Sequence, residues 1–374
     1  MEKRIVHYDT TKYPQFIYHL GINTTVALTH AHLTKVFGDI TLIDRTESLP
    51  SPINVKIKYP LPEYKTVSNI DDIGLQRACD LIDYANANNK TIRVMWSGGL
   101  DSTCALIWLL NCGKDINKFE VALNQYSIDE YPAFFYSVLQ KLPIKIVNTG
   151  RYVLDIEDDV MLVTGEHGDQ LFGNTVMKRF RSDVKLFGYD KYYYEHNINA
   201  MTLPMYPLFE MLFVEASLDV NGGPRIKEYL KPLIDRAPFK LKTLFDLTWW
   251  INFTMKWQEV GYRMTSTCPK KHDNHFGFFS SNEFQQWSMD EKNHIENKID
   301  WNSVDPWNST YKKALRNVIL HYTGDTHYYS TKPKVDSLMH HNLNGMFLRY
   351  EDGTYDTFKD VILNIEDYKN IIVV

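Results

Sequence analysis

The stretch Val94–Leu110, VMWSGGLDSTCALIWLL, places two adjacent glycines, several hydroxyl groups and one carboxylate between two apolar segments. The first segment, Ile92–Trp96, is short and apolar, which is typical of a buried strand. The second, Thr103–Asn111, carries leucines at helical spacing, and Gly113 follows where such a helix would end. The stretch therefore predicts a strand, a glycine turn and a helix in direct succession.

A glycine turn between a buried strand and a helix is suited to binding phosphate. Gly98 and Gly99 allow backbone N–H groups to approach a ligand, and the helix N-terminus adds partial positive charge. Asp101 is out of place beside an anion unless a cation mediates, so its carboxylate predicts a Mg²⁺ ligand. The alternative is a structural turn in which Asp101 caps the helix. The predicted phosphate site comprises Ser97, Gly98, Gly99, Leu100, Asp101, Ser102 and Thr103.

Strand and helix patterns continue to alternate after this stretch. A capping-box pattern, S-I-D-E, begins at Ser127 and predicts a helix that runs to about Lys141. Alternation at this spacing requires right-handed crossovers and therefore a parallel sheet covered by helices on both faces, an α/β fold. Further strands are predicted at Phe119–Leu123, Ile144–Val147 and Val160–Val163.

The pattern differs on either side of this region, which predicts three parts. Residues 1–65 form a small N-terminal region, with short strands expected at Val26–Leu28 and Ile40–Ile43 and several prolines before the boundary. Residues 66–340 form the main domain, mostly helical from about 175 onward. Residues 341–374 form a C-terminal tail in which Asp352-Gly353 predicts a hairpin turn.

Composition and charge argue against several classes of function. The 374 residues carry 41 basic and 46 acidic side chains, a formal net charge of −5, so no global field favours nucleic acid or an anionic membrane. Lys178, Arg179 and Arg181 form a local basic patch beside aromatic residues, and nucleic-acid binding through it is the disfavoured alternative. We therefore expect neither a nucleic-acid nor a membrane partner.

The sequence also predicts a cytoplasmic protein. The longest unbroken apolar run, Cys104–Leu110, is too short for a signal peptide or a membrane span. The four cysteines form no C-x-x-C pair, so we expect reduced thiols. Cys268, His272 and His275 are the one loose metal-like group, and we interpret it as a surface loop.

The segment Ser97–Ser102, S-G-G-L-D-S, resembles the pyrophosphate loop of the N-type ATP pyrophosphatases, the PP-loop family. That family includes asparagine synthetase, β-lactam synthetase, GMP synthetase, NAD synthetase and tRNA-thiolating enzymes, which adenylate a substrate and release pyrophosphate. The segment is not a Walker motif, because that motif needs a lysine after its second glycine. The resemblance implies a parallel sheet of the adenine-nucleotide α-hydrolase type, with ATP and Mg²⁺ as cofactors.

A second motif resembles asparagine synthetase within this family. Thr164–Gly173, T-G-E-H-G-D-Q-L-F-G, is similar to the pattern S-G-E-G-x-D-E-x-F-G-G and again follows a predicted strand. The resemblance implies that Gly165 contacts ATP and that Glu166 is the catalytic glutamate. It also implies that Asp169 shares a Mg²⁺ with Asp101. The sequence departs from the pattern at His167, Gln170 and Asn174, so the identity of the substrate stays open.

Softer similarities follow in the family's order and extend the resemblance over roughly residues 70–340. Ser127–Glu130 and Phe276–Trp287 resemble two further family segments. Tyr311–Arg316, Y-K-K-A-L-R, resembles the K-x-x-L-R motif, which implies that Lys312 is the catalytic lysine. On a helix Arg316 would share the face of Lys312 and point at phosphate; the alternative is a solvated basic surface. Lys332-Pro333-Lys334 resembles a later segment in which Lys334 would bind pyrophosphate.

The resemblance implies an ATP-dependent carbon–nitrogen ligase. We expect ATP to adenylate a small-molecule carboxylate, aspartate as the first choice, and ammonia or an amine to attack the acyl-adenylate. Glu166 would accept a proton and Lys312 would stabilise the oxyanion. Two alternatives stay open: an adenylating amide ligase for another small molecule or a modified nucleobase, and an inactive nucleotide-binding protein.

The nitrogen source is predicted from a difference between the N-terminal region of this chain and that of full-length asparagine synthetases. Full-length asparagine synthetases carry an N-terminal glutaminase whose nucleophile is the cysteine after the initiator methionine, whereas this chain has Glu2 and no cysteine in residues 1–65. We therefore expect a synthetase domain without the glutaminase domain. Nitrogen would come from free ammonia, from an amine or from a separate glutaminase partner.

Overall fold

The computed structural model describes about two thirds of the chain, and the chain divides into two compact units. The parallel-sheet unit comprises Pro62–Phe172 and Cys268–Asn342, and the antiparallel-sheet unit comprises Met1–Leu61, Gly173–Thr267 and Leu343–Val374. The described residues are 4–9, 27, 29–30, 33–34, 42–51, 53–114, 119–148, 156–173, 222–263, 273–297, 312–332, 335, 348–364 and 366–367.

This division differs from the predicted domains. The sequence placed 66–340 in one domain, but Gly173–Thr267 belongs to the same unit as the two chain termini. The regions 1–65 and 341–374 are not separate parts either, because a strand from each pairs in one sheet. The grouping depends on packing between segments that are distant in the sequence, and the pattern of apolar and polar residues along the chain does not indicate which segments pack together.

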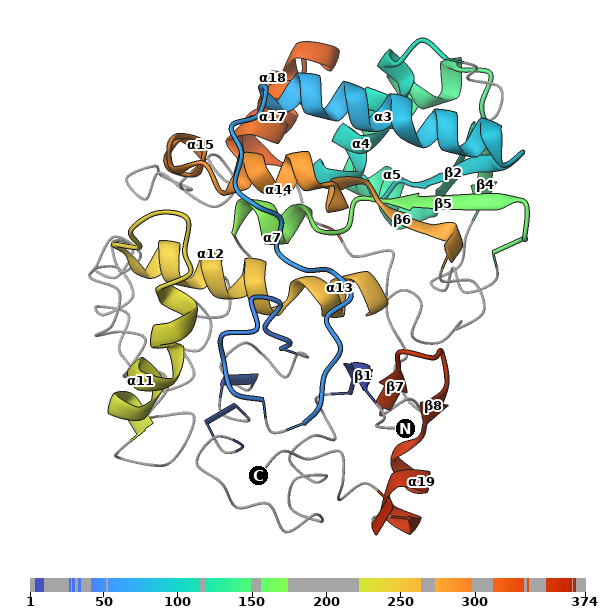
Figure 1. Ribbon diagram of the computed structural model, residues 1–374. Helices are drawn as coiled ribbons and strands as arrows, with labels where there is room; N and C mark the ends of the chain where they lie inside the picture. Colours follow the sequence, from blue (N-terminus) through green and yellow to red (C-terminus); the bar gives the residue numbers. More distant parts are fainter. Residues whose placement is uncertain are drawn as a thin grey trace. The chain divides into compact units, whose positions relative to one another are not determined.

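The first unit is built on a five-stranded parallel sheet with strand order β4-β3-β2-β5-β6. The expected α/β class with a parallel sheet is confirmed (Figure 1). β6 was not predicted, because a three-residue strand carries almost no periodicity. The strands are β2 (Thr91–Met95), β3 (Phe119–Leu123), β4 (Lys145–Asn148), β5 (Val160–Thr164) and β6 (His275–Gly277).

Helices of this unit pack around α4, which follows β2. α3 (Ile70–Ala87) and α17 (Lys313–Thr323) both contact α4 (Leu100–Asn111), and the three lie together in Figure 1. Trp108 of α4 is buried and stacks on Phe278 at 5.7 Å between ring centroids. The remaining helices are α5 (Gln125–Glu130), α6 (Pro132–Ser137), η2 (Leu139–Lys141), α7 (Gly168–Phe172), η5 (Phe278–Ser280), α14 (Asn282–Ser288), α15 (Glu291–Glu296) and α18 (Thr326–Thr331).

Two local predictions in this unit are wrong. The helix expected from Ser127 to Lys141 is broken into α5, α6 and η2, and Ser127 is not its N-cap. Asn124 caps α5 instead, with Ser127 as its capping-box partner, since an asparagine competes well for that position. The expectation of four reduced thiols also fails, because Cys79 and Cys112 form a disulfide across a Cα–Cα distance of 5.9 Å.

The second unit contains an antiparallel sheet of β1 (Ile5–Tyr8), β7 (Leu348–Tyr350) and β8 (Tyr355–Asp356). The hairpin predicted around Asp352-Gly353 is confirmed by the pairing of β7 with β8. Its helix α12 (Leu244–Met255) contains the fully buried Trp249 and Trp250. The other helices are α11 (Gly222–Ile234), α13 (Trp257–Arg263) and α19 (Phe358–Leu363).

The expected strands of the N-terminal region are not formed at the described positions. Ala27 is helical where Val26–Leu28 was expected to be extended, and Leu42 and Ile43 belong to no strand. The basic patch at Lys178–Arg181 lies outside the described residues. Within the part of the chain that the structure describes, no helix combines the length and apolar character that crossing a bilayer requires.

Candidate functional site

The glycine turn lies where the sequence predicts it, between the carboxyl end of β2 and α4. Gly98 has φ of +77°, and a Cβ there would lie 2.5 Å from the carbonyl oxygen of Ser127. The Ser97 hydroxyl accepts a hydrogen bond from Gly99 N at 3.3 Å and lies 3.0 Å from the Ser102 hydroxyl. Because the hydroxyls bind the turn itself, its backbone is held in one conformation at the start of α4.

Among the described residues, no side chain caps the start of α4. Its N-cap is Gly99, so the alternative in which Asp101 caps the helix is not observed. Thr103 is fully buried and accepts a hydrogen bond from the Trp96 indole at 3.0 Å, which ties the helix to the end of β2. Leu100 is buried as well. Asp101 is thereby left to interact with other elements of the unit.

The second motif lies against the first. β5 pairs with β2 in parallel, so the turn after β5 and the turn after β2 leave the same edge of the sheet. A Cβ at Gly165 would lie 2.7 Å from Ser102 N, and one at Gly168 would lie 2.5 Å from Asp101 Cγ. Both glycines are therefore required by the close approach of the two turns, which brings Asp101 and Asp169 together.

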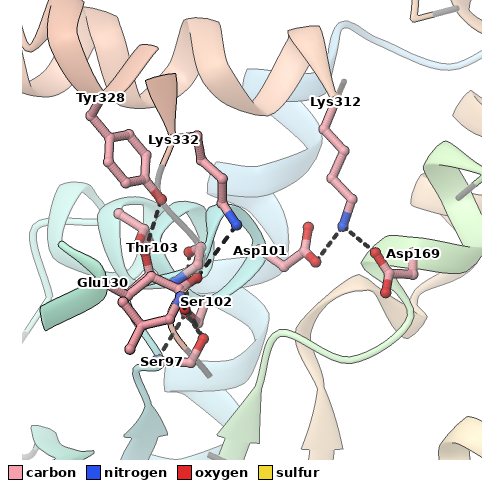
Figure 2. A network of polar contacts seen from close by, with 12 residues as sticks. Ser97, Asp101, Ser102, Thr103, Glu130, Asp169, Lys312, Tyr328 and Lys332 are labelled. Carbon is pink, nitrogen blue, oxygen red and sulfur yellow. Dashed lines mark hydrogen bonds and ion pairs between the residues drawn. The ribbon is translucent and has the colours of Figure 1, made fainter. Parts of the chain in front are cut away.

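Lys312 joins the two carboxylates. Its ammonium donates to Asp101 and to Asp169, the latter at 2.7 Å, and Figure 2 shows it between them. The Lys312 side chain is 2% exposed, whereas the side chain of Asp169 is 37% exposed, so the cluster is open to solvent on one side. The Phe172 ring lies 5.9 Å from the same ammonium. Lys312 occupies the N-cap position of α17 with φ of 52°.

Charge and burial oppose each other in this cluster. Burial alone would lower the pKa of Lys312, but Asp101 and Asp169 outweigh it and raise that pKa above its ordinary value. Burial raises the pKa of Asp101, although Lys312 acts in the opposite direction. The ammonium therefore stays charged at neutral pH and is the counter-ion that the two aspartates require.

A second cluster on the other side of the glycine turn was not predicted. Glu130 is fully buried, lies 3.4 Å from the Lys332 ammonium and accepts a hydrogen bond from Val335 N at 3.3 Å. Tyr328 donates from its hydroxyl to the carbonyl oxygen of Gly98 at 2.8 Å (Figure 2). The sequence interpretation treated Glu130 as a capping residue. Glu130 ends the short helix that follows β3, close to the strand ends where ligands bind in parallel sheets, and this position could have identified it as a site residue.

The remaining residues of the second motif lie beside these clusters. Glu166 is half-buried, and its N–H donates to the Thr164 hydroxyl at 3.4 Å. His167 is buried with φ of +71°, a conformation that suits the glycine of the family pattern. A Cβ at Gly277 would lie 2.8 Å from His167 Nδ1, so this imidazole fills the space against the end of β6.

Other predicted site residues are not brought into the cluster. Arg316 is buried and donates to the backbone carbonyl of Tyr329, so it connects α17 with α18. Lys334 lies outside the described residues, as do Cys268 and His272. His275 lies in β6, 3.2 Å from the Thr164 hydroxyl.

Comparisons with known proteins add no relative. No protein-family model matches the chain, and no curated protein and no solved structure matches it. Among the described residues, no group of three or more histidine, cysteine, aspartate or glutamate side chains is arranged to hold a metal. The site is therefore characterised by its own geometry: a glycine turn at a helix N-terminus, two convergent aspartates, the buried Lys312 and the partly buried Lys332.

Proposed function

We propose that this chain is an ATP-dependent amide-forming ligase of the PP-loop type. It would adenylate a small-molecule carboxylate, release pyrophosphate and transfer the acyl group to ammonia or an amine. One observation carries the proposal: Asp101 and Asp169, which follow neighbouring parallel strands, converge on Lys312 beside a glycine turn that opens a helix. Strand ends, a free helix N-terminus and carboxylates are the usual components of a magnesium–phosphate site.

The residues present fit ATP with Mg²⁺. Asp101 Oδ1 is buried without a hydrogen-bond partner among the described residues, so this oxygen is available as a ligand for a cation. Mg²⁺ usually binds proteins through one or two carboxylates and completes its shell with water and phosphate, so Asp101 and Asp169 are sufficient. When bound, the ion would supply positive charge that stabilises the departing pyrophosphate.

The chain's own residues would contribute positioning and charge. The backbone of Ser97–Thr103 would bind the phosphates while an oxygen of the substrate carboxylate bonds to the α-phosphorus and the bond to pyrophosphate breaks. In the second step the nitrogen nucleophile attacks the acyl carbon, AMP leaves, and Glu166 accepts the proton lost by nitrogen. Lys312 would stabilise the negative charge that develops on the acyl oxygen.

A second candidate keeps this chemistry and changes the acid. His167 is buried in a left-handed conformation where the resemblance expects glycine, and its ring fills space beside β6. A bulky imidazole so close to Glu166 favours a carboxylate other than aspartate, including one on a modified nucleobase. Either way the nitrogen would be ammonia, an amine, or ammonia from a separate glutaminase.

The test is exchange of labelled pyrophosphate into ATP, measured with the purified chain across a panel of carboxylic acids. Exchange with aspartate alone supports the first candidate, and exchange with a different acid supports the second. D101N should lower the exchange rate by about a hundredfold or more, because it removes charge from a preorganised site. D129N is the matched control, since Asp129 is exposed on α5. Absence of exchange with every acid would leave an inactive nucleotide-binding protein and overturn the ligase proposal.

A further inference from the structure

We propose that Lys312 is the resident cation of the aspartate pair, and that a divalent metal enters only together with the phosphates of a nucleotide. The inference rests on the proposed function and concerns the order in which the site fills. Its starting observation is that one ammonium, 2% exposed, is hydrogen-bonded to both Asp101 and Asp169. The position between the two carboxylates is therefore already taken by positive charge.

A metal ion and this ammonium exclude one another. Mg²⁺ lies about 2.1 Å from each oxygen ligand, so an ion that bridges the two aspartates needs the space that Lys312 Nζ fills. Charge leads to the same conclusion, because two carboxylates balance one divalent ion, and an added ammonium beside that ion would be repelled. Lys312 must therefore swing away whenever a metal bridges the pair.

A metal alone offers no compensation for that displacement. A displaced, buried ammonium without a partner is costly. Two aspartates are also a small ligand set, and the described residues offer no third histidine, cysteine, aspartate or glutamate beside them. Free metal should therefore bind weakly.

A nucleotide removes both obstacles. Its phosphate oxygens complete the shell of the metal and give the displaced ammonium a new anionic partner. Asp101 Oδ1, buried and without a hydrogen-bond partner among the described residues, provides a ligand atom, and the 37% exposed side chain of Asp169 provides a path for entry. The backbone of Lys312 at φ of 52° is uncommon for a residue with a side chain, and the ion pairs with both aspartates offset that strain. Metal and nucleotide binding are thus coupled through one side chain.

The experiment measures binding of Mn²⁺ to the full chain by electron paramagnetic resonance, with and without a non-hydrolysable ATP analogue. Native protein should bind Mn²⁺ about tenfold or more tightly when the analogue is present. K312M should bind Mn²⁺ without nucleotide about tenfold more tightly than native protein, and the analogue should then add little. K313M is the matched control, because the neighbouring Lys313 is exposed; it should behave as native protein does.

Equal Mn²⁺ affinity of K312M and native protein in the absence of nucleotide would overturn the inference. If K312M fails to fold, native protein alone decides: an Mn²⁺ affinity that is the same with and without the ATP analogue contradicts the coupling. K312R keeps the positive charge and should keep metal out. The outcomes separate this inference from the ligase proposal: pyrophosphate exchange with no effect of K312M on Mn²⁺ rejects the inference alone. Coupled binding of Mn²⁺ and nucleotide without exchange rejects the ligase alone.

Discussion

Tyr328 donates a hydrogen bond from its side-chain hydroxyl to the backbone carbonyl of Gly98, over 2.8 Å, and so joins α18 to the glycine turn more than 200 residues earlier. The ring of Tyr328 stacks on Tyr131 with 3.6 Å between centroids. Burial raises the pKa of this phenol, so the hydroxyl keeps its proton and remains a donor. The conformation of the glycine turn therefore depends on α18, which belongs to the C-terminal segment of the same unit.

We expect Y328F to loosen the turn without removing the aromatic stack. Loss of this hydrogen bond to the Gly98 carbonyl should lower the free energy of unfolding by about 1 kcal/mol and weaken nucleotide binding. Denaturant unfolding and calorimetric titration with ATP measure the two effects. Y329F is the control, because the contact that Tyr329 makes with Arg316 uses its backbone carbonyl. Unchanged ATP affinity in Y328F would show that α18 does not support the turn.

Gly98 and Gly113 form a matched pair, since both have φ near +70°. A Cβ at Gly98 meets backbone and Glu130, whereas a Cβ at Gly113 meets nothing within 4 Å among the described residues. G113A should cost about 1 kcal/mol through backbone strain alone and leave ATP affinity intact. G98A should cost more and reduce ATP affinity at least about tenfold, because the turn must shift away from its neighbours. Similar ATP affinities for the two variants would contradict this placement of the phosphate site.

E130Q tests the second cluster. The substitution keeps the shape of the side chain but removes the negative charge that Glu130 presents to the Lys332 ammonium, which is 15% exposed. We expect the free energy of unfolding to fall by roughly 3 kcal/mol, the usual result of removing one partner from a buried pair. Chemical denaturation measures it, and D129N, which makes the same change one residue earlier on the exposed face, should have almost no effect. A loss as small as that of D129N would mean that the pair contributes little.

Stability should also fall on mild acidification, for a reason located in the other unit. Burial lowers the pKa of His7 and of His30 to about 4 from 6.5. The unfolded state therefore binds more protons than the folded state between pH 4 and pH 6.5, so stability rises with pH across that window and falls as acid is added. Each histidine should cost roughly 2 kcal/mol on going from pH 7 to pH 5.

H7F isolates one of these contributions. Neither ring nitrogen of His7 has a hydrogen-bond partner among the described residues, so phenylalanine removes the titrating group without breaking a bond. Urea unfolding at pH 7 and pH 5 should show a smaller loss in H7F than in native protein. H321Q, at an exposed position, should show the native loss. An unaltered pH dependence in H7F would mean that His7 protonates as readily in the folded state as in the unfolded state.

The sequence predicted those parts of the fold that depend on local patterning. Ile92–Trp96 and Phe119–Leu123 were recognised as strands because a short apolar run beside a turn signal is a local property. The glycine turn and the start of α4 were predicted for the same reason. The convergence of Asp101 with Asp169 followed from parallel strands whose carboxyl ends share one edge.

What the sequence did not predict depends on distant parts of the chain. Glu130 was assigned to helix capping, since its contact with Lys332 arises from packing between segments 202 residues apart. Arg316 was expected beside Lys312 on one helical face, which assumes helical backbone at both residues. Arg316 N does donate to Lys312 O, but Lys312 is the N-cap of α17 in a left-handed conformation, so that assumption fails at Lys312. Periodicity does not indicate where a helix starts with such accuracy.

The division of the chain into interleaved segments has a consequence for biosynthesis. Pro62–Phe172 supplies the glycine turn and both aspartates, and Lys312 and Lys332 are translated only after Gly173–Thr267, which belongs to the other unit. A ribosome-bound intermediate that stops before residue 312 thus holds two neighbouring acids with no lysine to neutralise them. The order of translation makes the cluster assemble late, when the second segment of its unit joins the first.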